Sequence, residues 1–220
     1  MRVLIAAMLV SCASTGYAAT IDGHIDLFSE GKPLRPEEAQ DAIVYFRPKV
    51  PLQAVPQRPV QSMSTVRKQF VPRVLATTVG SEVRFPNQDP ILHNAFSTSK
   101  DNAFDVGLYA QGDGQAVTFS HVGYVRVYCN VHHSMIGHIL VLDTPYFVRP
   151  DTSGNFHLAD VPAVEGDLVV WSERASPWHE VVNAGAAAPM TVKLELTQRR
   201  IPTHMNKFGK PYGRSPDGGY

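Results

Sequence analysis

The chain has 220 residues, with 20 Lys plus Arg, 20 Asp plus Glu and a formal net charge of zero at pH 7. A chain of this length forms one large domain or two small ones. The neutral balance argues against nucleic acid and anionic membrane surfaces as partners, because both call for a basic excess. The 17 Pro and 16 Gly indicate many turns, which favours a turn-rich protein over a helical one.

The first residues have the pattern of a secretory signal peptide. Arg2 is a short basic region, residues 3–10 are apolar, and small residues stand at the −3 and −1 positions of a cleavage site. The apolar run is too short to span a membrane. We expect a signal peptide over residues 1–19, cut after Ala18 or Ala19, and a bacterial periplasmic protein with no membrane span.

Cysteine is scarce in this chain. Cleavage of the signal would remove Cys12 and leave Cys129 alone, so the mature protein could form no internal disulfide. A lone thiol in an oxidising compartment persists when it is buried or bound to a metal. A competing interpretation of the N-terminus is a lipoprotein box at residues 9–12, in which Cys12 would carry a lipid.

The elements that follow are short strands separated by turns. Residues 21–28 alternate loosely and end at a Gly- and Pro-bearing turn, and residues 42–46 are an apolar run of strand length. Closely spaced prolines then make a stretch that is unsuited to a sheet interior. We expect an extended Pro-rich linker over residues 51–61.

A second group of strands occupies residues 62–144. Its candidates are residues 66–70, 81–85, 116–119, 124–128 and 139–142. Short strands at such regular spacing are typical of an antiparallel sandwich. Few segments look helical, so the expected fold class is all-β.

A third group of strands includes residues 156–158, 168–171 and 190–196. In the last of these, alternate apolar residues share one face, as expected for a half-buried strand. The tail, residues 199–220, has no hydrophobic period and is rich in Gly, Pro and Lys, so we expect it to be disordered.

The stretch YCNVHHSM, residues 128–135, places a cysteine beside other metal-ligating side chains. Side chains alternate along the preceding strand, so Val125, Val127 and Cys129 should all face inward. The thiol is thus expected at the inner end of a core-facing row. There the strand becomes a loop, which can fold back on itself.

Four side chains form the candidate metal site: His93, Cys129, His132 and Met135. A thiolate binds Cu(I) well, imidazole suits Cu(II), and a thioether makes a weak axial bond, so this donor set serves both oxidation states of one copper ion. Zinc also binds Cys and His but rarely takes Met. His133 is an alternative ligand, because it directly follows His132.

Residues 62–144 resemble the cupredoxins, the blue type 1 copper proteins of the amicyanin and plastocyanin kind, often described as methylamine-utilisation-like. The resemblance rests on Phe70-Val71-Pro72, on residues 79–85, on Asn87, Asp89, His93 and Asn94, and on Cys129-x-x-His132-x-x-Met135. It implies a Greek-key β-sandwich and favours His132 over His133 as the ligand. It also implies that Asn94 ties the two ligand loops together.

The flanking segments are similar to a transthyretin-like or carboxypeptidase-regulatory-like sandwich. The similarity rests on Asp151 to Phe156, on Val161-Pro162 and on the run before Trp171, with an opening piece at residues 31–45. Neither flank holds enough strands to close a sandwich alone. We therefore expect residues 20–50 and 145–198 to combine, with the cupredoxin inserted between them and a structural or adhesive role for the combined domain.

The resemblance implies an electron carrier that works between periplasmic redox proteins, such as a c-type cytochrome and a dehydrogenase. Apolar residues near the site, Ile91, Leu92, Tyr109 and Ile136, are expected to form the docking patch. Copper storage or delivery without redox traffic, and a structural role in the envelope, are the alternatives. An enzyme is not expected, because the His-x-His and His-Cys-His patterns of multicopper oxidases are absent from the sequence.

Overall fold

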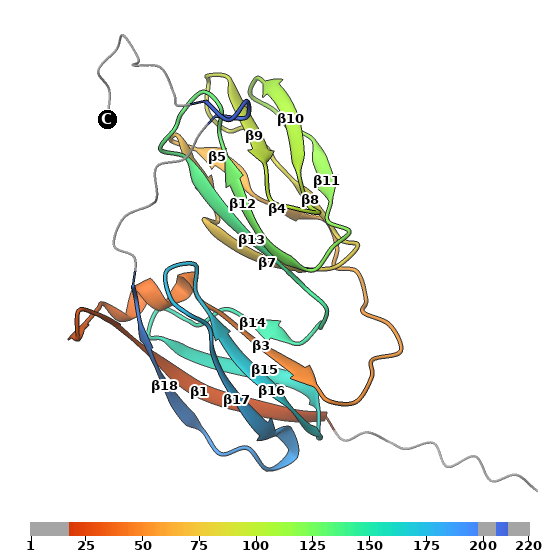
Figure 1. The fold of residues 1–220 in the computed structure, drawn as a ribbon, viewed down its shortest axis with the longest axis vertical. Helices are drawn as coiled ribbons and strands as arrows, with labels where there is room; N and C mark the ends of the chain where they lie inside the picture. The colour runs from red at the N-terminus through yellow and green to blue at the C-terminus, as the bar shows by residue number, and fades with distance from the viewer. Residues whose placement is uncertain (1–17, 198–205, 211–220) are drawn as a thin grey trace, which may run out of the picture.

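Strands dominate the computed structural model of the chain, which describes residues 18–197 and 206–210. They build two sandwiches, one above the other in Figure 1. We call the one built from both flanks the outer sandwich and the one between them in sequence the inserted sandwich. The expected all-β class is confirmed.

Helical structure in the described residues is limited to two short 3-10 helices, η1 (Pro36–Asp41) and η2 (Ala184–Ala186). No described helix is long and apolar enough to cross a membrane. The expected signal peptide and the lipoprotein box at Cys12 lie outside the described residues, except for Ala18 and Ala19. These two alanines begin strand β1, so cleavage after either of them would leave nearly the whole strand.

The outer sandwich has two sheets, and each joins strands from both flanks. In the first, β1 pairs antiparallel with β15 and β2 and parallel with β18. In the second, β3 pairs antiparallel with β14 and β16, and β16 with β17. The bounds are β1 (Ala18–Ser29), β2 (Lys32–Pro33), β3 (Ile43–Pro48), β14 (Phe147–Val148), β15 (Asn155–Pro162), β16 (Glu165–Trp171), β17 (Trp178–Asn183) and β18 (Met190–Glu195).

Alternation along the strands builds the outer core. Val192 and Leu194 in β18 are buried, whereas Lys193 and Glu195 are exposed. These side chains pack with Phe46 and other apolar residues from both sheets in one hydrophobic cluster.

The inserted sandwich is built around a five-stranded sheet in the order β10-β9-β12-β13-β7. Its bounds are β7 (Val74–Thr78), β9 (His93–Ser97), β10 (Phe104–Tyr109), β12 (Gly123–Tyr128) and β13 (Ile136–Leu142). The smaller sheets contain β4 (Gln61–Ser62), β5 (Ser64–Val66), β6 (Gln69–Val71), β8 (Glu82–Arg84) and β11 (Ala116–Thr118). Most pairings are antiparallel, but β7 with β13 and β4 with β8 are parallel.

The Pro-rich connection runs into the inserted sandwich without pairing as a strand. Residues 49–60, all described, form no strand, and β4 begins at Gln61, the last residue of the expected linker. The Pro56 carbonyl accepts a hydrogen bond from the Thr78 hydroxyl, and the Arg58 amide donates to the Ser81 hydroxyl. The connection therefore lies along the inserted sandwich.

The two sandwiches meet through a small apolar cluster and a set of ion pairs. Ile43 and Trp171 of the outer sandwich pack with Val74 and Leu140 of the inserted one. Beside them Arg73 donates to Asp41 at 2.7 Å and to Glu173 at 2.6 Å.

Part of the expected disordered tail is ordered. Residues 206–210 form a compact turn, which Figure 1 draws in blue at the end of the inserted sandwich farthest from the outer one. The rest of residues 199–220 lies outside the described residues, including His204 and Met205.

Candidate metal centre

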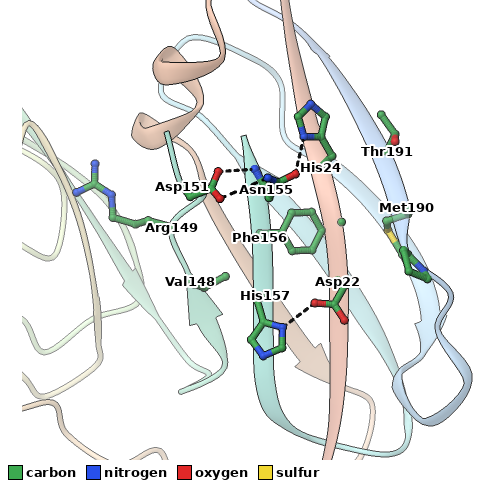
Figure 2. A pocket seen from close by; sticks show the side chains of 12 residues that line it. Asp22, His24, Val148, Arg149, Asp151, Asn155, Phe156, His157, Met190 and Thr191 are labelled. Atoms are coloured by element: carbon green, nitrogen blue, oxygen red, sulfur yellow. Dashed lines mark hydrogen bonds and ion pairs between the residues drawn. The ribbon is translucent and has the colours of Figure 1, made fainter. Parts of the chain in front are cut away.

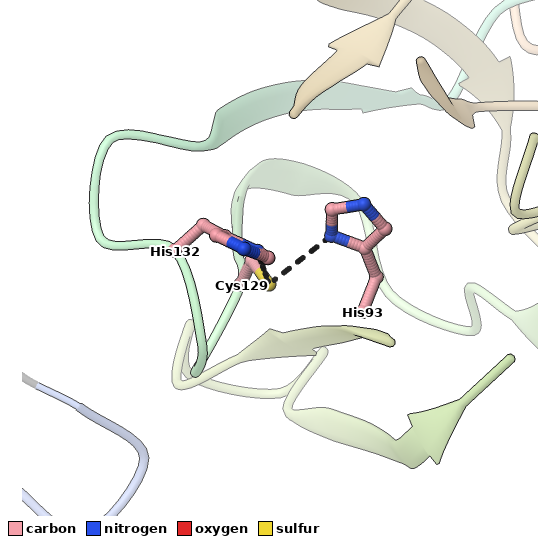
Figure 3. Close-up of side chains that lie close together, drawn as sticks. All are labelled: His93, Cys129 and His132. Atoms are coloured by element: carbon pink, nitrogen blue, oxygen red, sulfur yellow. Dashed lines mark hydrogen bonds between the residues drawn. The ribbon is translucent and has the colours of Figure 1, made fainter. Parts of the chain in front are cut away.

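Three candidate ligand side chains converge at one end of the inserted sandwich (Figure 3). The ligand atoms of His93, Cys129 and His132 lie within 4.8 Å of one another. The Cys129 Sγ is 3.8 Å from Nδ1 of each histidine. His93 and Cys129 are completely buried, whereas His132 is partly exposed. The cluster therefore has a closed inner side and an edge near solvent.

Strand geometry explains the convergence. In β12, Val125 and Val127 are buried and Arg126 is exposed, and Cys129 continues the buried row directly after the strand. The neighbouring strand β9 runs antiparallel to β12, so its first residue, His93, lies at the same end of the sheet.

The loop after Cys129 turns back toward the core. The Met135 amide donates to the His132 carbonyl at 3.0 Å, which closes a turn. Met135 is buried in the same apolar cluster as Cys129. His133 is exposed and is not part of the three-residue ligand group. The structure thus brings His93, Cys129 and His132 together and leaves His133 outside.

Asn94 links the two ligand-bearing segments. Its Oδ1 accepts a hydrogen bond from the Asn130 amide at 3.3 Å. Its Nδ2 donates to Asp105 Oδ1 at 2.7 Å and to the Gly107 carbonyl at 2.8 Å. Because Asn94 follows His93 and Asn130 follows Cys129, this buried side chain fixes one ligand segment against the other.

Asp89 fixes the ring of His93. Its Oδ2 is 2.8 Å from Nε2 of His93, and its side chain is only 11% exposed. With the Nε2 hydrogen donated to this carboxylate, Nδ1 is left free to face the Cys129 sulfur. A carboxylate in this position orients a metal-ligating histidine and raises its basicity.

Asp89 is itself held by the turn between β5 and β6. The amides of Arg67 and Lys68 donate to its two carboxylate oxygens at 2.6 and 2.8 Å. Both residues adopt left-handed backbone conformations, with φ of 50° and 58°. Burial alone would raise the pKa of Asp89, but the Lys68 and Arg67 amides and His93 outweigh it and lower the pKa below its usual value. The carboxylate therefore stays ionised beside His93.

His132 is held in the form that binds metals. Its pKa is lowered, first by burial and then by the charges of His93 and Lys68. A neutral imidazole has a free nitrogen lone pair to offer, so the shift favours the ligand form.

The surface around His132 differs from the expected docking patch. Leu92 is 53% exposed and Ile91 is also exposed, but Ile136 is only 7% exposed and belongs to the interior. Tyr109 is partly buried, with its hydroxyl inside the protein. The expectation that Ile136 belongs to the docking patch is wrong, because strand β13 begins at this residue and is buried along its whole length. Val131, in the ligand loop, is 49% exposed and was missed.

Donor chemistry allows a test of which metal fits. One buried thiolate, two imidazoles and a buried thioether nearby are soft and borderline donors, which match copper in both oxidation states. Hard cations such as Mg²⁺ and Ca²⁺ prefer oxygen ligands. The residues present therefore fit a copper ion.

A second group of histidines and acids lines a surface hollow of about 610 Å³ in the outer sandwich (Figure 2). His24 bonds to Asn155 at 3.0 Å, and His157 to Asp22 at 2.7 Å. Among the described residues, only His93, Cys129 and His132 bring three ligand atoms together. The histidines and acids of the outer hollow therefore form separate hydrogen-bonded pairs, and their ligand atoms do not converge on one point.

No protein-family model matches the chain, and no curated protein sequence matches it. Among solved structures, a reduced variant of amicyanin is similar with 19% identity, covering 38% of this chain and 82% of that one, at a TM-score of 0.36. A purple cupredoxin from Nitrosopumilus maritimus is similar with 21% identity, 37% and 99% coverage and a TM-score of 0.34. A copper-containing nitrite reductase from Thermus scotoductus has 25% identity, 53% and 28% coverage and a TM-score of 0.37.

Proposed function

We propose that the inserted sandwich is a cupredoxin and that the chain carries single electrons between redox partners. One type 1 copper ion would be held by His93, Cys129 and His132, with Met135 as a weak fourth ligand. The observation that carries this proposal is the buried Cys129 thiol with an imidazole nitrogen of each histidine at 3.8 Å. When bound, the copper supplies one-electron chemistry by alternating between Cu(I) and Cu(II).

The residues around the centre support a carrier because they hold the ligands still. Asp89 fixes the His93 ring, and Asn94 fixes the Cys129 loop against the strand that carries His93. Ligands that keep their positions in both oxidation states need little rearrangement, which makes electron transfer fast. Storage or delivery would need ligands that let the metal go, so these contacts favour the carrier.

Electrons would enter and leave at the His132 edge. His132 is the one ligand of the three with partial exposure, and the exposed Leu92 and Val131 offer apolar contact area around it. Redox encounters are small and short-lived, so a patch of a few apolar residues suffices. We propose a periplasmic redox protein as partner, such as a c-type cytochrome or a dehydrogenase, and a carrier rather than an enzyme.

The outer sandwich would be a transthyretin-like or carboxypeptidase-regulatory-like module with a structural or adhesive role. The turn before β15 supports this likeness. The Asp151 carboxylate accepts hydrogen bonds from the amides of Ser153 and Asn155, and Gly154 adopts a φ of 86°. The sandwich thus serves as the frame from which the redox domain projects.

Adding one equivalent of Cu(II) to the purified protein tests the proposal. We expect an intense visible absorption band that ascorbate bleaches and an oxidant restores, with an EPR spectrum unlike that of tetragonal Cu(II). A colourless complex with an ordinary tetragonal EPR spectrum would contradict the proposed electron-carrier function. N-terminal sequencing of protein recovered from a periplasmic fraction tests the proposed cleavage after Ala18 or Ala19.

A further inference from the structure

The C-terminal turn, residues 206–210, lies on the inserted sandwich although it follows the last strand of the outer one. The turn is closed by its own hydrogen bonds. Asn206 Oδ1 accepts from the amides of Phe208 and Lys210, and the Gly209 amide donates to the Asn206 carbonyl. It therefore presents Lys207 to the inserted sandwich from a defined backbone.

Lys207 contacts the segment that carries Cys129 and a neighbour of the strand that carries His93. Its backbone amide donates to Asn130 Oδ1 at 3.2 Å. Its Nζ is 2.6 Å from Asp105 Oδ2. Asn130 directly follows Cys129, and Asp105 accepts from Asn94, which directly follows His93. Lys207 thus contacts the residue that follows Cys129 directly and reaches the residue that follows His93 through Asp105.

The contacts form a closed ring of hydrogen bonds. Asn130 donates its amide to Asn94, Asn94 donates its side chain to Asp105, and Lys207 bonds to both ends. Asn94 is buried, and the side chains of Asp105 and Lys207 are 37% and 28% exposed. The ion pair is thus partly shielded from water, and its attraction is less screened than that of a surface pair.

Lys207 helps to stabilise the charge of Asp105. Its two oxygens accept hydrogen bonds from Asn94, the Gly107 amide and Lys207. Burial opposes its charge, whereas Lys207 and then Asn94 favour it, and the net effect lowers the pKa of this carboxyl. Removing the ammonium would leave the carboxylate to bend toward its other donors and release one side of the ring.

We propose that Lys207 is a positioning residue for the metal centre, which acts through Asn130 and Asp105 to hold the Cys129 and His93 segments together. The C-terminal turn is then a strap over the centre. This inference deepens the proposed copper function and rests on it for its second readout only. The first readout concerns the metal-free protein.

The test compares Lys207→Ala with Lys207→Arg and Lys210→Ala. Lys210 belongs to the same turn, and among the described residues its side chain makes no ion pair. Lys210→Ala therefore changes the net charge by the same amount as Lys207→Ala without removing an ion pair. The first readout is amide hydrogen exchange of Asn130 in the metal-free protein. The second is the rate at which excess EDTA strips Cu(II) from the loaded protein, followed by loss of the visible band.

We expect Lys207→Ala to speed both exchange at Asn130 and copper release about three- to ten-fold, the scale of one partly shielded ion pair, because alanine removes the bond to Asp105 and keeps the backbone amide bond to Asn130. Lys207→Arg keeps the positive charge, so its exchange and copper-release rates should be close to those of the wild type. Lys210→Ala should match the wild type. In the double variant Lys207→Ala, Asp105→Asn, the increase in both rates should be smaller than the two single increases combined, because both substitutions remove the same contact.

Equal exchange and equal copper release in Lys207→Ala and Lys210→Ala would overturn the strap, since the turn would then rest on the surface without holding the ligand segments. If the wild type binds no copper in a coloured site, the proposed function fails, yet exchange at Asn130 still decides the role of Lys207. The two failures are therefore distinguishable.

Discussion

The two sandwiches differ in what they bury. The outer core packs apolar residues from both flanks into one cluster, and the buried polar residues of this sandwich include only small ones such as Ser29 and Ser172. The inserted sandwich adds buried polar groups, among them Asn87, Asp89, His93 and Asn94, gathered near the start of β9. Buried polar groups cost free energy unless they are hydrogen-bonded. Their concentration at one end of one sandwich, each with partners, distinguishes the inserted sandwich, which holds the candidate metal centre, from the outer one.

The largest effect should come from Cys129→Ser. Serine removes the thiolate that gives the intense visible band, so we expect the band to disappear completely in the Cu(II) titration. His133→Ala is the matched control, because His133 is exposed and lies outside the ligand group, and its band should persist. A band that survives in Cys129→Ser, or vanishes in His133→Ala, would show that the ligand set is wrong.

Phe46→Ala should damage the frame without changing the centre. Phe46 is completely buried in the outer core, and truncation of such a ring costs about 3–5 kcal/mol. Urea unfolding should show this loss, whereas Val181→Ala, at an exposed position of the same sheet, should stay within about 0.5 kcal/mol of the wild type. A folded Phe46→Ala protein that cannot form the visible band would contradict the separation of the two sandwiches.

Asp89→Asn sharpens the comparison inside the centre. Asparagine loses the charge beside His93 and keeps only one acceptor oxygen, so it can no longer accept the Arg67 amide on one oxygen and the Lys68 amide and His93 Nε2 on the other. Loss of such a partner typically lowers metal affinity about 10- to 100-fold, and competition with a chelator measures it. Asp113→Asn removes an exposed charge from the same sandwich and should leave the affinity unchanged. Equal metal affinities in Asp89→Asn and Asp113→Asn would show that Asp89 does not support the metal centre.

His138 lies beside Arg73, where the two sandwiches meet, and its environment leads us to expect that acid lowers the stability of the protein. Burial first, and then Arg73 and Arg126, lower its pKa to about 3. Its Nδ1 is 2.6 Å from the Tyr124 hydroxyl, and Arg73 Nη1 is 3.3 Å from Nε2, a contact that only a neutral ring can accept. The unfolded chain takes up this proton near pH 6.5, so stability is full above that pH and falls between pH 6.5 and about 3.

The expected loss is at most about 1.4 kcal/mol per pH unit for one such group. Urea unfolding of the metal-free protein at pH 7, 6, 5 and 4 should therefore show a shallower acid slope for His138→Gln than for the wild type. His179→Gln, at an exposed position, should keep the wild-type slope. Identical slopes in all three proteins would mean that His138 does not titrate as its contacts imply.

Short-range patterns predicted much of the fold. Alternation in residues 124–128 predicted the inward direction of Cys129, which is completely buried. The paired flanks followed from counting strands, and β1 does pair with β15 and β18.

Short-range patterns could not predict contacts between distant residues, and the Asn94 link between the ligand loops was expected only from the resemblance. Asp89 bonds to amides more than twenty residues away, and its spacing of four residues from His93 was the only local hint. The docked turn at residues 206–210 was missed for the same reason, because Lys207 finds Asp105 only through the tertiary fold. Composition alone suggested a disordered tail there.

Copper K-edge X-ray absorption of the loaded protein, recorded in both oxidation states, tests the central claim most directly. We predict one short copper–sulfur bond and two copper–imidazole bonds in both states, with little change between them. A first shell of nitrogen and oxygen alone, or a ligand set that rearranges strongly on reduction, would contradict a thiolate-bound electron carrier.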